Sequence, residues 1–177
     1  MTDTRGPGTP VRVAVLDDYQ GRAHSYADWA SLGAGFEVVF FDHAIGRDEL
    51  VGTLAGFEVL AVMRERTAFP REVLEGLPAL RLLVTTGMRN ASVDVEYLRS
   101  ERGIVVSGTD ISGHRVAGGV PSTVEVAWAL ILATTKRMLI EDSAIRSGRW
   151  QLDIPTNLAG ATLGLAGLGN LGSAMVG

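Results

Sequence analysis

The chain has 177 residues, 46% of them hydrophobic, and a formal net charge of −4 without any run of basic residues. This length and composition suit one domain, or one domain with part of another, and exclude an intrinsically disordered chain. Because nucleic-acid binding needs a concentrated positive surface, we expect no nucleic-acid partner. The sequence has no cysteine, which excludes disulfides, thiolate metal sites and cysteine nucleophiles.

The sequence predicts neither a signal peptide nor a membrane span. Residues 1–10 lack the apolar core of a signal peptide, and we interpret them as a disordered lead-in. The longest strongly apolar run, residues 124–133, falls far short of the roughly 20 residues that span a bilayer. We therefore expect a cytoplasmic protein without a membrane partner.

Short β-rich runs alternate with helical stretches over the first part of the chain. The expected strands cover residues 11–16, 36–41, 57–63, 80–84 and 104–107. The expected helices cover residues 22–32, 47–55, 70–77 and 93–102. This alternation predicts a parallel sheet covered on both faces, and nearly continuous apolar strands are typical of such burial. We predict an α/β fold, a flavodoxin-like doubly wound parallel sheet, over residues 11–107.

The pattern changes in residues 108–177. Residues 110–120 are rich in glycine and indicate a connecting loop. Ser122 and Glu125 have the spacing of a capping box for a helix that runs to about Met138. This helix is apolar on nearly every face, which predicts that it is buried, and its length of roughly 25 Å would link two lobes. The last expected elements are a polar helix over residues 141–150 and a strand over residues 161–166.

The sequence ends with GLGNLG and five more residues, a match to the glycine fingerprint of a dinucleotide-binding turn. In such a turn Gly167 allows the tight bend, Gly169 the approach of the pyrophosphate, and Gly172 close packing of helix on sheet. The amides near Asn170 and Leu171 would bind phosphate. The acidic residue that holds the ribose is expected about 20 positions further on, beyond the given sequence. A glycine-rich strand and turn without a ligand is the alternative.

Four segments occur in the same order as in D-isomer-specific 2-hydroxyacid dehydrogenases: "VMRERTAFPREVLEGLPALRLLVTTGMRNASVDVEYLRSERGIVV", "STVEVAWALILATTKRM", "GRWQ" and "LAGATLGLAGLGNLGSAMVG". The sequence therefore resembles this family from about residue 11 to residue 177. In the family a flavodoxin-like substrate lobe is built from both ends of the chain, and a Rossmann lobe is inserted between them. The resemblance implies that residues 108–177 hold the interdomain helix and the first strand and turn of a truncated NAD-binding Rossmann domain.

The resemblance implies hydride transfer between NAD, or alternatively NADP, and a D-2-hydroxy or 2-keto acid. Thr123 aligns with a cofactor-contacting threonine of some relatives, or is simply part of the first helical turn. The family's catalytic arginine, acidic residue and histidine follow the fingerprint, so we assign no catalytic residue here. His24, His43 and His114 precede it and are interpreted as surface or loop residues. For a full-length form the expected assembly is a homodimer.

The resemblance also implies that the chain alone is inactive. The alternative function is a non-catalytic α/β fragment that acts as an interaction or dimerisation module through its apolar helix. Such a helix would present a large apolar surface, which is costly to expose on a free monomer.

The substrate-side loop, residues 85–90, follows the fourth expected strand. It lies at the carboxyl end of the sheet, where open α/β folds bind ligands. Family members hold the substrate carboxylate with backbone amides of this loop, which makes Met88, Arg89 and Asn90 the candidate substrate-binding residues. Many members have a glycine in place of Arg89. Its side chain would either add charge to the cleft or pair with Asp94.

Two further groups of charged residues leave alternatives open. Arg64 and Arg66, after the third expected strand, are either carboxylate anchors or structural partners of Glu65. Asp17 and Asp18 end the first strand, where receiver domains bind magnesium through carboxylate oxygens. The third strand lacks the aspartate that such a domain needs, so we interpret the pair as a helix cap or strand stop and assign no metal.

Overall fold

The computed structural model describes residues 8–109 and 121–176. The chain divides into two compact units, Met1–His114 and Arg115–Gly177, and each is described by itself. Most of the expected lead-in, the glycine-rich loop of residues 110–120 and His114 lie outside the described residues. Within the described ranges no helix is long and apolar enough to cross a membrane.

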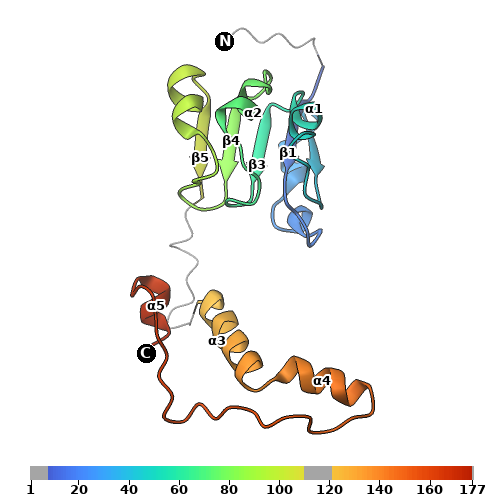
Figure 1. Ribbon diagram of the computed structural model, residues 1–177. Helices are drawn as coiled ribbons and strands as arrows, with labels where there is room; N and C mark the ends of the chain where they lie inside the picture. The colour runs from blue at the N-terminus through green and yellow to red at the C-terminus, as the bar shows by residue number, and fades with distance from the viewer. Residues whose placement is uncertain (1–7, 110–120, 177) are drawn as a thin grey trace. The chain divides into compact units, whose positions relative to one another are not determined.

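The first unit contains a parallel five-stranded sheet with the strand order β2-β1-β3-β4-β5 (Figure 1). This is the doubly wound order of flavodoxin-like folds, so the predicted fold class is confirmed. Every strand overlaps the run that predicted it. The strands are β1 Val11–Val15, β2 Phe36–Phe40, β3 Val59–Val62, β4 Leu82–Thr85 and β5 Val105–Gly108.

The helical segments of this unit are shorter than predicted. They are η1 Ala23–Ser25, η2 Trp29–Leu32, α1 Leu50–Leu54, α2 Arg71–Glu75 and η3 Tyr97–Glu101, of which η3 is a π-helix. The single helix predicted over residues 22–32 is wrong. In its place the Ser25 hydroxyl donates to the Arg22 carbonyl, and the Asp28 carboxylate accepts from the Ser31 N–H. Short polar side chains that bond to nearby backbone in this way favour turns over continuous helix.

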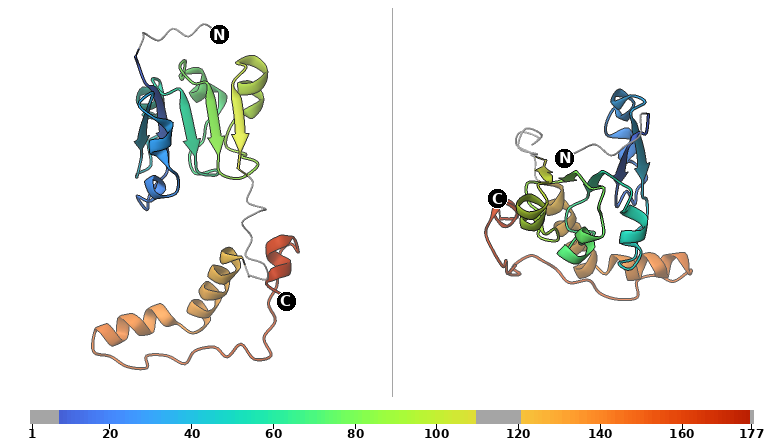
Figure 2. Two further views of the ribbon diagram at one scale, coloured as in Figure 1. Left: turned by 180° about the vertical axis from the view of Figure 1, so that it is seen from behind. Right: turned by 90° about the horizontal axis from the view of Figure 1, so that it is seen from above.

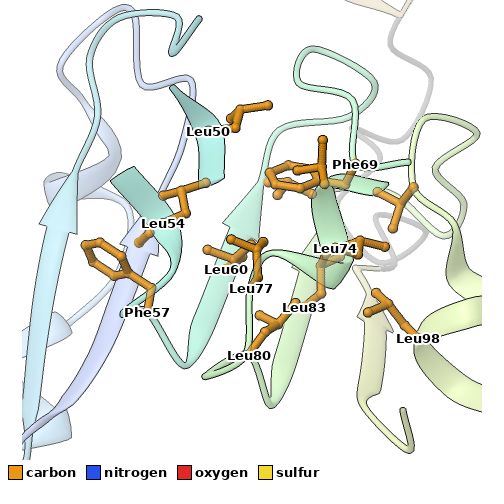
Figure 3. Packing of buried hydrophobic residues seen from close by; sticks show 14 of the residues in the cluster. Leu50, Leu54, Phe57, Leu60, Phe69, Leu74, Leu77, Leu80, Leu83 and Leu98 are labelled. Atoms are coloured by element: carbon orange, nitrogen blue, oxygen red, sulfur yellow. The ribbon is translucent and has the colours of Figure 1, made fainter. Parts of the chain in front are cut away.

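The hydrophobic core lies on the sheet face covered by α1, α2 and η3 (Figures 2 and 3). The register places Leu60 of β3 opposite Leu83 of β4, and both side chains are fully buried. Leu54 of α1, Leu74 of α2 and Leu98 of η3 pack against the same cluster and are also fully buried. This core holds the strand ends that carry the loops described below.

The opposite face of the sheet is covered over β1 and β2 but open over β5. Trp29 of η2 packs edge-on against Phe40 of β2, with ring centroids 5.4 Å apart. Val13 of β1 shares this face with Val105 of β5 through the strand register, yet Val13 is 6% exposed and Val105 63%. The expectation that helices cover both faces of the whole sheet is therefore wrong at β5 within the described residues.

The second unit contains three helices, α3 Ser122–Thr135, α4 Met138–Arg146 and α5 Asn170–Ala174. The expected continuation of the first helix to Met138 is interrupted because Arg137 adopts a left-handed conformation with φ 54°. The predicted capping box does not form: Pro121 is the N-cap, Ser122 is the first helical residue, and no side chain caps the helix. A residue inside the first turn no longer has the geometry of a cap.

Burial of α3 and the last strand were also predicted wrongly for these residues. Val124 is buried, but Leu130 is 62% exposed and Val126 57%. Residues 161–166 form no strand. Both predictions required neighbours: a parallel strand needs an adjacent strand, and an apolar helix face is buried only when another surface covers it.

Candidate functional site

The candidate site lies in the first unit, where the loops after β3 and β4 meet. The Arg64 N–H donates to the Thr86 hydroxyl at 3.0 Å, and the Asn90 side-chain amide donates to the Arg64 carbonyl at 2.5 Å. The loops are therefore joined from both sides. Because parallel strands end at the same edge of the sheet, these loops share the edge at which open α/β folds bind ligands.

Asn90 holds the loops together. Its side chain is buried, and Nδ2 also donates to the Thr85 hydroxyl at 3.0 Å while Oδ1 accepts from the Ser92 N–H at 2.9 Å. Both Nδ2 protons and Oδ1 thus have partners inside the protein. The hydrogen-bonding groups of the Asn90 side chain, a predicted substrate-binding residue, are therefore used within the protein. Its backbone N–H is the group that remains for a ligand.

Two glycines that the sequence reasoning did not single out shape the same loop. Gly87 has φ +96°, in the left-handed region that favours glycine, and its N–H donates to the Thr109 hydroxyl at 2.8 Å. At Gly108, the last residue of β5, a Cβ atom would lie 2.6 Å from the Gly87 carbonyl oxygen. The only sequence signal for this close approach is that both positions, Gly87 and Gly108, are glycine.

Three successive backbone N–H groups of this loop have no acceptor among residues 8–109 and 121–176. Among the described residues, the N–H groups of Met88, Arg89 and Asn90 donate to no carbonyl or side chain. Met88 is 68% exposed, and Arg89 is also exposed. Runs of successive backbone N–H groups can form anion-binding concavities. The structure thus brings the three predicted substrate-binding residues together in one short loop.

The Arg89 side chain makes no ion pair within the described part of the chain. The carboxylate of Asp94, its proposed structural partner, instead accepts from the Tyr97 N–H at 3.0 Å. An Arg89–Asp94 ion pair is thus not formed, and the Arg89 charge remains beside the three N–H groups.

The two arginines after β3 have different roles. Arg66 donates through Nη1 to the Asp17 carbonyl at 2.9 Å, so its partner is not the predicted Glu65. Arg64 has φ 51° and lies against Gly87, where a Cβ atom would be 2.7 Å from its Nη1. Glu65 pairs with neither arginine and accepts from the Ala91 N–H at 3.4 Å. Arg64 is therefore the cation that flanks the loop.

The acidic pair after β1 stops the strand and caps the following turn. The Asp18 carboxylate accepts two backbone N–H groups at the start of η1, at distances between 2.8 and 3.1 Å. Asp17 is 2% exposed, and its carboxylate accepts from the Tyr19 hydroxyl at 2.9 Å and the Thr67 hydroxyl at 3.0 Å. The hydrogen bond to Asp17 raises the pKa of Tyr19. The structure confirms the cap interpretation for Asp18.

The glycine fingerprint in the second unit forms a tight turn. Gly167 has φ +99°, and Gly169 is the N-cap of α5, so Asn170 and Leu171 begin the helix. A Cβ atom on Gly172 would overlap the Gly167 carbonyl oxygen. The tight bend predicted at Gly167 is therefore present, whereas Gly172 is required by a contact within the turn and not by the predicted packing of helix on sheet.

The remaining predicted positions are exposed. Thr123 lies in the first turn of α3, as its structural alternative requires, and its cofactor contact stays a prediction. His24 and His43 are exposed, as expected for surface residues.

Residues 13–126 match the family model described as "D-isomer specific 2-hydroxyacid dehydrogenase, catalytic domain". A glyoxylate reductase from Thermococcus onnurineus is 25% identical over 152 residues, which cover 79% of this chain and 43% of that protein. A D-3-phosphoglycerate dehydrogenase from Mycobacterium tuberculosis is 30% identical over 145 residues, which cover 81% of this chain and 26% of that protein.

Among solved structures, a phosphoglycerate oxidoreductase from Vibrio cholerae matches with a TM-score of 0.79 and 30% identity. The match covers 94% of this chain and 51% of that one, so the chain spans about half of that protein and less of the two curated relatives. The family match alone extends over more than half of the sequence. The chain therefore belongs to the D-isomer-specific 2-hydroxyacid dehydrogenase family.

Proposed function

We propose that this chain is the substrate-side part of an NAD(P)-dependent 2-hydroxyacid dehydrogenase, and that residues 88–90 bind the carboxylate of a D-2-hydroxy or 2-keto acid. The observation that carries the proposal is the run of three backbone N–H groups, at the carboxyl end of β4, that have no acceptor in the described part of the chain. A cytoplasmic location agrees with the cysteine-free sequence.

A carboxylate fits this loop in both hydrogen bonding and charge. It offers two oxygens to the N–H groups of Met88, Arg89 and Asn90, and hydrogen bonds to an ionised acceptor are stronger than neutral ones. The guanidinium of Arg64 lies beside Gly87 and makes no ion pair with any described residue. It therefore adds a positive charge that no acidic side chain in the described structure neutralises.

The glycines of the fingerprint turn stand at the spacing that dinucleotide-binding turns use to hold a pyrophosphate. Gly167 makes the tight bend with φ +99°, and the N–H groups of Asn170 and Leu171 at the start of α5 would donate to phosphate oxygens. Bound NAD, or alternatively NADP, supplies the hydride chemistry. Thr123 is the proposed second cofactor contact.

Glycolate, the smallest 2-hydroxy acid, tests the carboxylate site in the 15N-labelled chain. We expect glycolate to shift the amide signals of Met88, Arg89 and Asn90, and the neutral ethylene glycol to leave them in place. Arg64→Gln is expected to weaken glycolate binding about tenfold, because it removes a charge-assisted contact. Arg22→Gln is the matched control, since Arg22 is exposed and its side chain bonds to no described residue. Unmoved amides, or equal shifts with ethylene glycol, would contradict the proposal.

We expect the purified 177-residue chain to oxidise no NADH in the presence of glyoxylate or hydroxypyruvate. No residue before the fingerprint matches the family's catalytic arginine, acidic residue or histidine, and the two described histidines are exposed. A thermal-shift titration with NADH tests the proposed cofactor contacts separately, and an unchanged melting temperature at millimolar NADH would mean that the turn before α5 is not a site. Turnover that persists after immunodepletion of any longer enzyme would overturn this prediction.

The alternative function is a non-catalytic interaction or dimerisation module, and the exposed apolar side chains of α3 favour it. Val126, Leu130 and Leu132 are between 42% and 62% exposed. Large apolar patches of this kind mark interaction surfaces or aggregation sites. Size-exclusion chromatography with light scattering tests the module: a stable monomer at all concentrations contradicts it.

A further inference from the structure

A second concave site opens in the first unit beside the ends of β1 and β3. It has a volume of about 710 Å³, and none of residues 85–90 lines it. Tyr19 comes from the loop after β1, and Arg66 and Thr67 come from the loop after β3. In the strand order 2-1-3-4-5 the chain reverses its winding between β1 and β3, and this switch point is where such sheets bind ligands.

Arg66 is the lining cation that lacks a carboxylate partner among the described residues. Of the other two, Arg47 pairs with Glu72 at 2.9 Å, and Arg71 pairs with Glu75 at 3.0 Å and with Glu101 at 2.7 Å. The hydrogen-bond partner of Arg66 is a neutral backbone carbonyl.

The carboxylates of Asp17 and of the lining residue Asp94 bind other groups. The Asp17 carboxylate accepts from hydroxyl groups, and the lining residue Asp94 accepts a backbone N–H. Neither pairs with Arg66.

The Arg66 guanidinium is held in place but keeps one edge free. Its carbon lies 4.9 Å from the centroid of the Tyr19 ring, and Nη1 is bonded to the Asp17 carbonyl. Nε and Nη2 have no acceptor among the described residues. These two nitrogens form an edge that can bind a carboxylate through two parallel hydrogen bonds. Because the stacking already orders the side chain, less conformational entropy is lost on binding.

The rest of the lining is largely apolar. Ile45, Leu50, Ala68, Pro70 and Val93 contribute to it. Pockets with an apolar lining and a few fixed polar groups suit small molecules with an apolar body and one oriented charge.

We propose that this pocket binds a small organic anion. Its carboxylate pairs with the free edge of Arg66, and its apolar body lies against Ile45, Leu50 and Val93. The proposal does not depend on carboxylate binding at residues 88–90, because different side chains and amides form the two sites.

Benzoate and benzyl alcohol are matched probes, since they share an aromatic body and differ in charge. In the 15N-labelled 177-residue chain, we expect benzoate to shift the amides of Thr67, Ser92 and Val93, and benzyl alcohol to bind about tenfold more weakly. Arg66→Gln should weaken benzoate binding about tenfold, while the exposed Arg22→Gln should leave it unchanged. Ala68→Phe, which fills the pocket from an exposed lining position, should abolish the shifts.

Benzoate shifts at Thr67, Ser92 and Val93 that Ala68→Phe removes support the site, even if Arg66→Gln does not fold. Shifts confined to Met88, Arg89 and Asn90 overturn it while supporting the carboxylate loop. Equal affinity for benzyl alcohol, or equal effects of Arg66→Gln and Arg22→Gln in folded variants, also overturns it.

Discussion

Replacing Asn90 by alanine is expected to lower the free energy of unfolding of the first unit by about 3 kcal/mol. The change removes the bonds of one buried side chain to the Arg64 carbonyl, the Thr85 hydroxyl and the Ser92 N–H. Each neutral hydrogen bond contributes about 1 kcal/mol, and partners left buried without a bond cost more. Urea unfolding followed by circular dichroism measures the loss. The same variant should also lose glycolate shifts at residues 88–90, because the loop is no longer tied to β3.

Asn90→Asp separates the roles of the two ends of the amide. It keeps an oxygen for the Ser92 N–H but places an oxygen, in place of Nδ2, against the Arg64 carbonyl. We therefore expect a loss at least as large as that of Asn90→Ala. Asn157→Ala is the matched control: Asn157 is exposed and accepts one bond from Ala159 at 3.3 Å, so the loss should stay below about 0.5 kcal/mol. A loss below about 1 kcal/mol for Asn90→Ala would contradict its holding role.

The sheet could be predicted because its signal is local. Each strand is a short run of apolar residues between turn signals, and residues such as Leu60 and Leu83 are buried as that pattern predicts. The segment after β1 could not be predicted in the same way. One helix was predicted over residues 22–32, but the backbone bonds of Ser25 and Asp28 produce two short turns.

The second unit shows where local patterns fail. The exposure of Leu130 in α3 and the absence of a strand over residues 161–166 both concern surfaces that need a neighbour. The glycine turn depends only on its own backbone. The tight bend predicted at Gly167 is present, with φ +99°, but Gly172 lies against the Gly167 carbonyl and not against a sheet as predicted. Elements that are stabilised by their own backbone can therefore be read from the sequence, whereas buried faces depend on what covers them.

The position of the candidate site was predicted, but its construction was not. The loop after β4 was found from the rule that ligands bind at the carboxyl ends of parallel strands. The holding role of Asn90 and the difference between Arg64 and Arg66 depend on two loops 22 to 26 residues apart in sequence. No single-sequence pattern encodes such a pairing. The one feature of this contact that is visible in the sequence is glycine at positions 87 and 108, where a larger residue would collide.

Gly108→Ala is expected to lower the free energy of unfolding by about 2 kcal/mol, within the range for overpacked interiors. The added methyl carbon would lie 2.6 Å from the Gly87 carbonyl oxygen and 2.9 Å from the Met88 Cα. Both are backbone atoms, so no side-chain rotation relieves the overlap, and either β5 or the loop must move. If the loop moves, the N–H groups of residues 88–90 lose their arrangement, and glycolate binding should weaken together with stability.

Gly52→Ala is the control for this substitution, because it makes the same chemical change without a collision. Gly52 lies in α1, and nothing stands within 4 Å of its added Cβ atom. Alanine is favoured over glycine in a helix, so we expect this variant to gain about 0.5 to 1 kcal/mol and to bind glycolate unchanged. The two variants should therefore change stability in opposite directions. If the Gly108→Ala protein is as stable as the parent, β5 shifts without a cost in free energy. The close contact between β5 and the loop then does not fix the positions of the three N–H groups.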